Sequence, residues 1–205
     1  MEQILPTILR NIVKQHEQHA RWLNTLSYME NAGAKKISAS EHPQDVTLLI
    51  LKHAAEEHRH AYYLKKQLAK IDPQACPTYH NQYLLAPNAS KYYLNTLDVH
   101  VCRHLRKELG LTGSDLKFAA YLLVTYAIEV RADALYPVYQ DVLDEAGSRV
   151  NVKSIILEEE GHLEEMLIQL KEFSPDWEKH ANVAIQIEEK LFQEWMKGLQ
   201  AETFV

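Results

Sequence analysis

The chain has 205 residues, a hydrophobic content of 46% and only 6 Gly and 7 Pro, so it can bury one sizeable core, and we expect a single domain over residues 1–205. Its formal net charge of −6 gives no electrostatic reason to expect a nucleic acid or an anionic membrane as a partner. The first six residues carry an acid and a proline instead of the basic and then apolar layout of a secretory signal, so we expect a cytoplasmic protein.

The first half of the chain predicts two long helices separated by a short break. Apolar residues recur at three- and four-residue steps over residues 6–37, and no glycine appears until Gly33. The next helix is expected over residues 43–70, with Ser40 or His42 as its N-cap candidate and a proline in its first turn.

A long crossover and four more helices are expected to follow. Three prolines, which cannot donate a backbone hydrogen bond, keep residues 71–87 in a connector that leads into an accessory helix. Pro137 should kink or divide the helix that carries the most apolar segment, residues 118–128. That segment is about half the roughly 20 residues of a membrane span, which favours a buried core helix. The four helices are expected over residues 88–109, from near residue 115 to the loop at 145–148, over residues 149–173, and from residue 177 to about residue 199.

Two of the predicted helices each carry a Glu-x-x-His pair. Glu57 and His60 stand in the second predicted helix, and Glu159 and His162 stand in the helix before the last one. Residues three apart share a helical face, so each glutamate points to the same side as its histidine. Such pairs also arise by chance, and they carry little weight without further residues at matching positions.

Each pair has one more glutamate in the helix that precedes it. Glu30 lies 27 residues before Glu57, and Glu129 lies 30 residues before Glu159. In an antiparallel hairpin two residues lie level when they are equidistant from the turn, and the two midpoints, 43.5 and 144, fall beside Pro43 and just before a glycine turn. We therefore expect four carboxylates and two imidazoles to converge, and their buried negative charge requires cations such as two divalent metals.

This pattern resembles the ferritin-like di-iron carboxylate superfamily, in which two helices supply one Glu each and two others supply Glu-x-x-His. The resemblance implies an all-α fold, a ferritin-like antiparallel four-helix bundle, here with a long crossover that carries an extra helix and with an additional C-terminal helix. It also implies two Fe ions, with Mn or a mixed Fe/Mn pair as alternatives. The metal ligands and catalytic residues that it implies are Glu30, Glu57, His60, Glu129, Glu159 and His162. Among them, Glu57 and Glu159 would bridge the metals, and each histidine would bind one.

Several further residues are secondary candidates. Glu56 and Glu158 precede the two bridging glutamates, where the superfamily often has an acid that holds a ligand histidine. Asp133 is a candidate proton donor or extra ligand, against a solvated or salt-bridged Asp, and Tyr126 is a candidate to face the metals, against packing in the core. Candidate walls of a cavity beside the metals are Leu26, Ile50, Ala54, Tyr126, Ile155 and Met166. Histidines expected at the surface or in the core instead of the site are His16, His19, His53, His58, His100 and His104.

The symmetric pattern with two histidines favours oxidases, oxygenases, rubrerythrin-like peroxidases or bacterioferritin-like proteins over iron-storage ferritins. Cys76 and Cys102 are too few for a rubredoxin site, which excludes a full-length rubrerythrin, and we treat both as free thiols. Leu64 stands where the ribonucleotide reductase small subunit has its radical tyrosine. We therefore expect an O2-activating oxidoreductase, an oxidase or oxygenase, that acts on an unidentified small or medium organic substrate.

Two other classes of protein stay open. One is a non-catalytic or iron-handling ferritin-like protein that oxidises or buffers iron or protects against peroxide, and an apolar pocket beside the metals would separate it from an oxygenase. The other is a metal-free helical interaction module, which would tolerate Glu57→Ala. An electron-donor protein and a second copy of the chain, in a homodimer, are further partners that the prediction admits, whereas nucleic acid and membrane are not expected.

Overall fold

The computed structural model describes residues 4–204, leaving aside the side chain of residue 160. Over this range the chain is all-helical and has no strand, so the predicted all-α class is confirmed. No helix in the described range is long and apolar enough to cross a membrane. The elements are α1 (Ile4–Lys14), α2 (His16–Ser40), α3 (Leu48–Leu68), the short 3-10 helix η1 (Asn81–Tyr83), α4 (Pro87–Leu109), α5 (Gly113–Glu145), α6 (Lys153–Phe173) and α7 (Trp177–Thr203).

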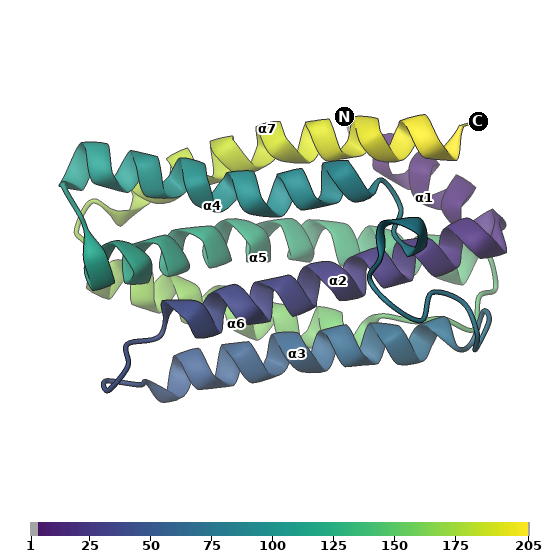
Figure 1. Ribbon diagram of the computed structural model, residues 1–205, viewed down its shortest axis with the longest axis horizontal. Helices are drawn as coiled ribbons and strands as arrows, with labels where there is room; N and C mark the ends of the chain where they lie inside the picture. The colour runs from purple at the N-terminus through teal and green to yellow at the C-terminus, as the bar shows by residue number, and fades with distance from the viewer. Residues whose placement is uncertain (1–3, 205) are drawn as a thin grey trace.

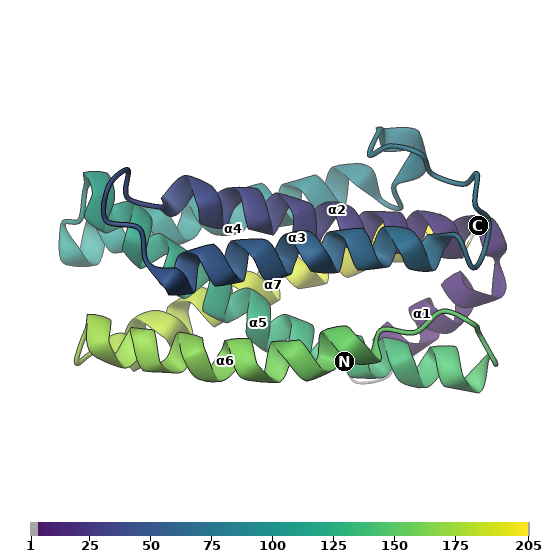
Figure 2. The ribbon, with the colours of Figure 1, turned by 90° about the horizontal axis from the view of Figure 1, so that it is seen from below.

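Two antiparallel helix pairs carry all six candidate residues. Helix α2 lies along α3, and α5 lies along α6, with the members of each pair running in opposite directions (Figures 1 and 2). Helices α4 and α7 pack against each other and against α5, on the side away from α3 (Figure 1). The described part of the chain therefore has the two expected hairpins, together with the accessory and C-terminal helices.

The single helix predicted over residues 6–37 is wrong, because the chain divides it into α1 and α2 at Gln15. Gln15 has φ −114° and ψ 108°, an extended conformation that ends one helical ladder and starts another at a different angle. The break lets Ile8, Leu9 and Ile12 of α1 become fully buried, in a helix that packs on α5 and α7 as well as on α2. The break thus follows from tertiary packing, since no Gly or Pro stands at this position to predict it.

The start of α3 also differs from the prediction. Ser40 is the last residue of α2, and His42 lies in the loop, where its Nδ1 accepts hydrogen bonds from backbone N–H groups of the same loop. Neither caps α3. Thr47 does so instead, since its hydroxyl oxygen accepts from the backbone N–H of Ile50 at 3.3 Å. The proline of this loop, Pro43, lies outside the helix.

Helix α5 runs unbroken through Pro137, so the predicted division there is wrong. One ladder bond is lost at a proline, but Leu135, Tyr136 and Tyr139 around it are all buried, and their packing holds the helical path. The apolar segment over residues 118–128 lies in the same helix and contributes a nearly continuous run of buried residues, as predicted for a core helix.

The turn between α5 and α6 determines which residues of these two helices lie side by side. Gly147 has φ +61°, a left-handed conformation that suits glycine, but α6 begins only at Lys153, four residues later than predicted. The intervening segment runs back along α5, because the backbone N–H of Val152 donates to the side chain of Gln140 at 2.8 Å. Helix α6 therefore starts near Gln140, before the end of α5, and this position brings Glu159 close to Glu129.

A buried ion pair ties α4, α5 and α7 together. Arg131 on α5 donates from Nε and Nη2 to the two carboxylate oxygens of Glu188 on α7, at 2.9 and 2.8 Å. Tyr93 on α4 donates its hydroxyl to the same carboxylate at 2.6 Å. Only 2% of the surface of Glu188 is exposed, so its charge depends on these two partners.

The connector between α3 and α4 packs against α2. Asn24 donates to the backbone carbonyls of Thr78 and Tyr83, at 3.0 and 2.9 Å. Cys76 lies in this connector and Cys102 on α4, and both are free thiols, as predicted. The connector thereby carries the chain across α2 and places α4 over α5.

Candidate metal centre

The six predicted ligand residues converge between the two hairpins. Their donor atoms form two groups in which all atoms lie within 4.8 Å of one another. The groups are Glu57, Glu129, Glu159 with His162, and Glu30, Glu57 with His60. Glu57 belongs to both groups, as expected of a carboxylate that bridges two cations. Five of the six residues have at most 7% of their surface exposed, and Glu30 is half-buried.

Both histidines turn Nδ1 toward the carboxylates. His60 Nδ1 lies 3.1 Å from Glu159 Oε1, and His162 Nδ1 lies 3.4 Å from Glu159 Oε2. His162 Nδ1 also lies 3.6 Å from Glu129 Oε1 and 3.9 Å from Glu57 Oε1. Glu159 is thus close to both imidazoles, although it belongs to one ligand group only; its predicted bridging role stays a prediction.

Three buried atoms at the centre have no hydrogen-bond partner among the described residues: the Nδ1 atoms of His60 and His162, and Glu159 Oε2. Buried polar atoms normally have a hydrogen-bond partner, so three such atoms without one, close together, need an explanation. Carboxylate oxygens with imidazole nitrogens are a donor set that suits Fe, Mn and Zn. The residues present therefore fit a pair of divalent cations.

The other ring nitrogen of each histidine is held by an acid from the opposite helix. His60 on α3 pairs through Nε2 with Glu158 on α6 at 2.8 Å, and His162 on α6 pairs through Nε2 with Glu56 on α3 at 2.9 Å. A carboxylate only accepts, so each Nε2 carries a proton, and each Nδ1 would offer its lone pair to a cation bound at the centre. The predicted role of Glu56 and Glu158 is thus matched by their geometry, with the added feature that the two contacts cross between helices.

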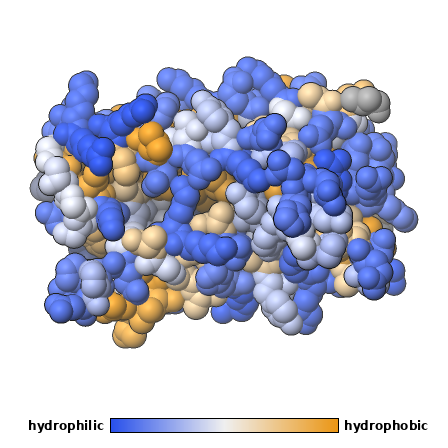
Figure 3. All heavy atoms as spheres, in the orientation of Figure 1, coloured by the Kyte–Doolittle hydropathy of each residue, from blue (hydrophilic) through white to orange (hydrophobic). Residues whose placement is uncertain are grey.

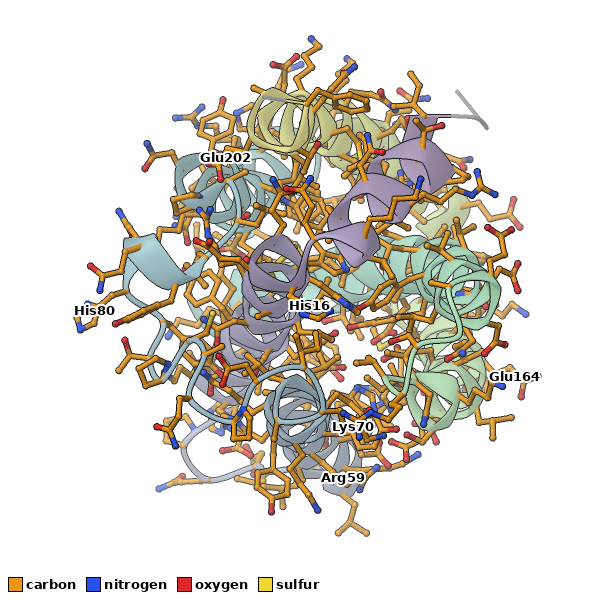
Figure 4. The ribbon with its side chains drawn as sticks, turned by 90° about the vertical axis from the view of Figure 1, so that its right-hand side faces the viewer. His16, Arg59, Lys70, His80, Glu164 and Glu202 are labelled. Carbon is orange, nitrogen blue, oxygen red and sulfur yellow. The ribbon has the colours of Figure 1, made fainter. Side chains whose placement is uncertain are left out.

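Basic side chains flank these acids on the outer surface. Arg59 donates to Glu158 at 2.6 Å, and Lys52 forms an ion pair with Glu165 on α6. Seen end-on, α3 and α6 lie next to each other, with Arg59 and Glu164 on the outer surface (Figure 4). A band of charged and polar side chains therefore joins α3 to α6 over the buried centre, and we call it the α3–α6 seam.

The electrostatics of the centre favour bound positive charge. Burial and neighbouring carboxylates raise the pKa of Glu57 and Glu129 well above its ordinary value. Burial also acts to raise the pKa of Glu159, but its contacts with Glu129 and the two histidines outweigh burial and hold that pKa far below its usual range. For His162 burial acts to lower the pKa, and the contact with Glu159 raises it to about 9; the pKa of His60 is raised for the same reason. Without a cation the cluster holds protons, which metal binding would release.

Tyr136 is a residue of the centre that sequence reasoning missed. Its hydroxyl donates to Glu30 Oε1, and the side chain is buried and lines the cavity described below. Burial and the charge of Glu30 raise the pKa of Tyr136 well above its ordinary value, so the hydroxyl keeps its proton. The signal in the sequence is its spacing, because Tyr136 follows Glu129 by seven residues, about two helical turns on the same face.

A cavity of about 270 Å³ opens beside the carboxylates. Helices α2, α4, α5 and α7 supply its walls, which are mainly apolar, and Glu30, Glu57, Glu129 and Glu159 line it on the side of the two ligand groups. In the space-filling view this face of the molecule is hollowed between α4 and α2, with apolar atoms in the hollow (Figure 3). Of the six predicted wall residues, Leu26 lines the cavity. The other five, Ile50, Ala54, Tyr126, Ile155 and Met166, do not, because the cavity lies on the α4 side of the centre and not between α3 and α6.

The secondary candidates have other surroundings. Asp133 is exposed, which matches the solvated alternative. Tyr126 is half-buried and packs edge-on against Trp177, with ring centroids 6.5 Å apart, so it does not face the centre. The histidines set aside in the sequence also lie outside both ligand groups: His16, His58 and His100 are exposed, and His19, His53 and His104 pair with Tyr139, Tyr121 and His180.

No protein-family model, curated protein or solved structure matches this chain.

Proposed function

We propose that this chain is a ferritin-like protein that binds two Fe ions and activates O2 to oxidise an organic substrate, as an oxidase or oxygenase. The observation that carries the proposal is the pair of overlapping ligand groups, with two unpartnered Nδ1 atoms at their centre and an apolar cavity at their side. The two helix pairs α2–α3 and α5–α6 would then form the four-helix bundle of that superfamily.

Two ferrous ions held there would supply electrons for the reduction of O2. The chain itself positions their ligands: Glu56 and Glu158 keep the protons on Nε2 of the histidines and leave Nδ1 free to bind. Tyr136 fixes one oxygen of Glu30 through its hydroxyl. The apolar walls of the cavity would limit the access of bulk water to the carboxylates, which protects a reactive centre from side reactions.

The cavity favours an organic substrate over iron handling alone. A centre that only oxidises or buffers iron needs a polar route for cations, and the α3–α6 seam is polar enough for that purpose. The apolar cavity gives such a protein no advantage, whereas a substrate with C–H bonds needs a dry, shaped space beside the metals.

The metal assignment is tested by anaerobic titration of purified protein with Fe(II), followed by exposure to O2. We expect about two Fe per chain, and consumption of O2 that depends on the bound metal. Glu57→Gln should abolish the binding of both ions, because Glu57 belongs to both ligand groups. Glu164→Gln, on the exposed surface of α6, is the matched control and should bind as the parent does. Failure of the parent protein to take up Fe(II) would refute the proposal.

The need for the cavity is tested with Gly33→Leu. Gly33 lines the cavity within α2, and an added Cβ there meets no atom within 4 Å, so there is space for a larger side chain that would occupy part of the cavity. Replacing a glycine within a helix also favours the helix, by up to about 1 kcal/mol. We expect Fe binding and folding to persist while oxidation of added organic substrates is lost. The control is Ala134→Leu at an exposed position of α5. Unchanged substrate oxidation in Gly33→Leu would favour the iron-handling alternative.

A further inference from the structure

The cavity is elongated, because its lining residues are spread along two antiparallel helices, α2 and α5. On α2 they extend from Leu26 to Ser40, and on α5 they extend from Lys117 to Tyr136. The part between the carboxylates and the outer end covers Glu30 to Ser40 on α2 and Glu129 back to Lys117 on α5. Ten residues of helix rise about 15 Å and twelve rise about 18 Å. The end of α2 and the start of α5 lie at the same end of the molecule, on the left of Figure 1. The part of the cavity between the carboxylates and that end thus forms a channel.

The two ends of the channel differ in charge. Its inner end holds the four carboxylates, and the middle is lined by apolar side chains. The outer end is lined by Lys36, Asp98 and Lys117. Lys36 is already engaged, since its Nζ donates to the backbone carbonyl of Leu94 at 2.9 Å and lies 3.6 Å from Asp98.

Lys117 differs from Lys36 in its surroundings. It is exposed at the outer end, and no carboxylate of the described residues forms an ion pair with it. The pair of Lys36 with Asp98 leaves the charge of Lys117 uncompensated in this part of the wall. A single positive charge at the mouth of an apolar channel is complementary to a ligand with an apolar body and one anionic end.

We propose that the channel binds an unbranched amphiphile with a single carboxylate head group, which pairs with Lys117 at the mouth while the far end of its chain reaches the Glu30–Glu129 carboxylates. An extended chain advances about 1.2 Å per bond, as three backbone bonds span 3.3–3.6 Å, so the channel takes about 12–15 bonds. As substrate of the metal centre, which rests on the proposed function, such a molecule would be oxidised near the end remote from its head group.

Binding is measured by calorimetry with unbranched carboxylates of increasing length and with the corresponding alcohols, on protein loaded with redox-inert Zn(II) and on protein as purified. We expect affinity to rise with chain length up to about 12–15 bonds and then to level off, because the end of the chain then meets the four carboxylates. Carboxylates should bind more tightly than alcohols of equal length. Gly33→Leu, which shortens the channel, should lower the affinity for the longest ligands at least about tenfold.

The head-group contact is tested with Lys117→Ala. The expected loss is up to about fivefold for carboxylates, which is the size of an exposed ion pair, and none for alcohols. Lys14→Ala, an exposed lysine of α1 that does not line the channel, is the matched control. Affinity that is independent of chain length, or alcohols that bind as well as carboxylates in both parent and Lys117→Ala, would overturn the inference. Length-dependent binding by a protein that takes up no iron would instead overturn the proposed function and leave the binding site in place.

Discussion

The contact between Glu158 and His60 provides a sharp test of the candidate centre. Glu158 accepts from His60 Nε2 at 2.8 Å and so fixes which nitrogen of the ring is free to bind. Glu158→Leu removes the acceptor, and the ring can then rotate or change tautomer. Loss of such an outer contact typically lowers metal affinity 10- to 100-fold, or about 1.4–2.7 kcal/mol.

The crossed arrangement makes the prediction specific to one ion. Glu158→Leu should lower the affinity for the ion in the group of Glu30, Glu57 and His60. Glu56→Leu should lower the affinity for the other ion, because Glu56 holds His162. Anaerobic calorimetry with Fe(II) should therefore show one tight and one weakened event in each variant. In a combined variant both events should be weakened.

Two controls separate this effect from a general change of charge. Glu164→Leu removes an exposed acid from the same helix and should leave both binding events unchanged. Arg59→Met removes the ion pair of Glu158 but leaves its contact with His60, and should cost less than about 1 kcal/mol, as is usual for exposed pairs. Affinities in Glu158→Leu within twofold of the parent, with the fold intact by circular dichroism, would refute the reasoning.

Three further predictions concern protons and stability. Fe(II) affinity should rise with pH up to about 9, with release of protons measurable in a weakly buffered titration, because the raised pKa values of Glu57, Glu129 and His162 mean that the metal-free centre holds protons. Because the pKa of His162 is raised to about 9 in the metal-free fold, protonation of His162 stabilises that fold fully below its ordinary pKa of 6.5, and this stabilisation is lost as the pH rises through about 9. The Tm of chelator-treated protein should therefore fall between these two pH values, while the Tm of metal-loaded protein does not. Parallel Tm curves for the two forms would contradict this prediction. Arg131→Met should lower the free energy of unfolding by about 3–5 kcal/mol in urea, because the charge of buried Glu188 loses its partner, and adding Glu188→Leu should recover much of the loss. Equal stability of the single and double variants would exclude an effect of the unpaired charge.

The convergence of the six residues could be predicted from their spacing, because a helix rises by a constant length per residue. Glu30 and Glu57 flank the α2–α3 loop almost evenly, so equal counts place them level. The second hairpin is less regular: helix α5 continues to Glu145, and α6 starts late at Lys153. The non-helical return segment, which covers more length per residue than a helix, compensates for the uneven counts.

The walls of the cavity could not be predicted in the same way. Periodicity identifies residues that share a face with a ligand, such as Ile50 and Met166, but it does not say which neighbouring helix lies opposite that face. Both of these residues are buried away from the cavity. Helix α4, expected only as an accessory on the crossover, instead supplies Tyr93 and Leu94 to the wall. The break at Gln15 escaped prediction for a related reason, since it depends on what α1 packs against.

The polar α3–α6 seam and the apolar channel lie on opposite sides of the carboxylates. Helices α3 and α6 are joined there by ion pairs and histidine contacts that water can replace, so a small separation of these helices would admit hydrated cations directly to the four glutamates. A hydrocarbon chain would enter from the other side, past Lys117. Under the proposed function, cations and organic ligands would thus enter from different sides, and a molecule that fills the channel should leave the rate of metal loading unchanged.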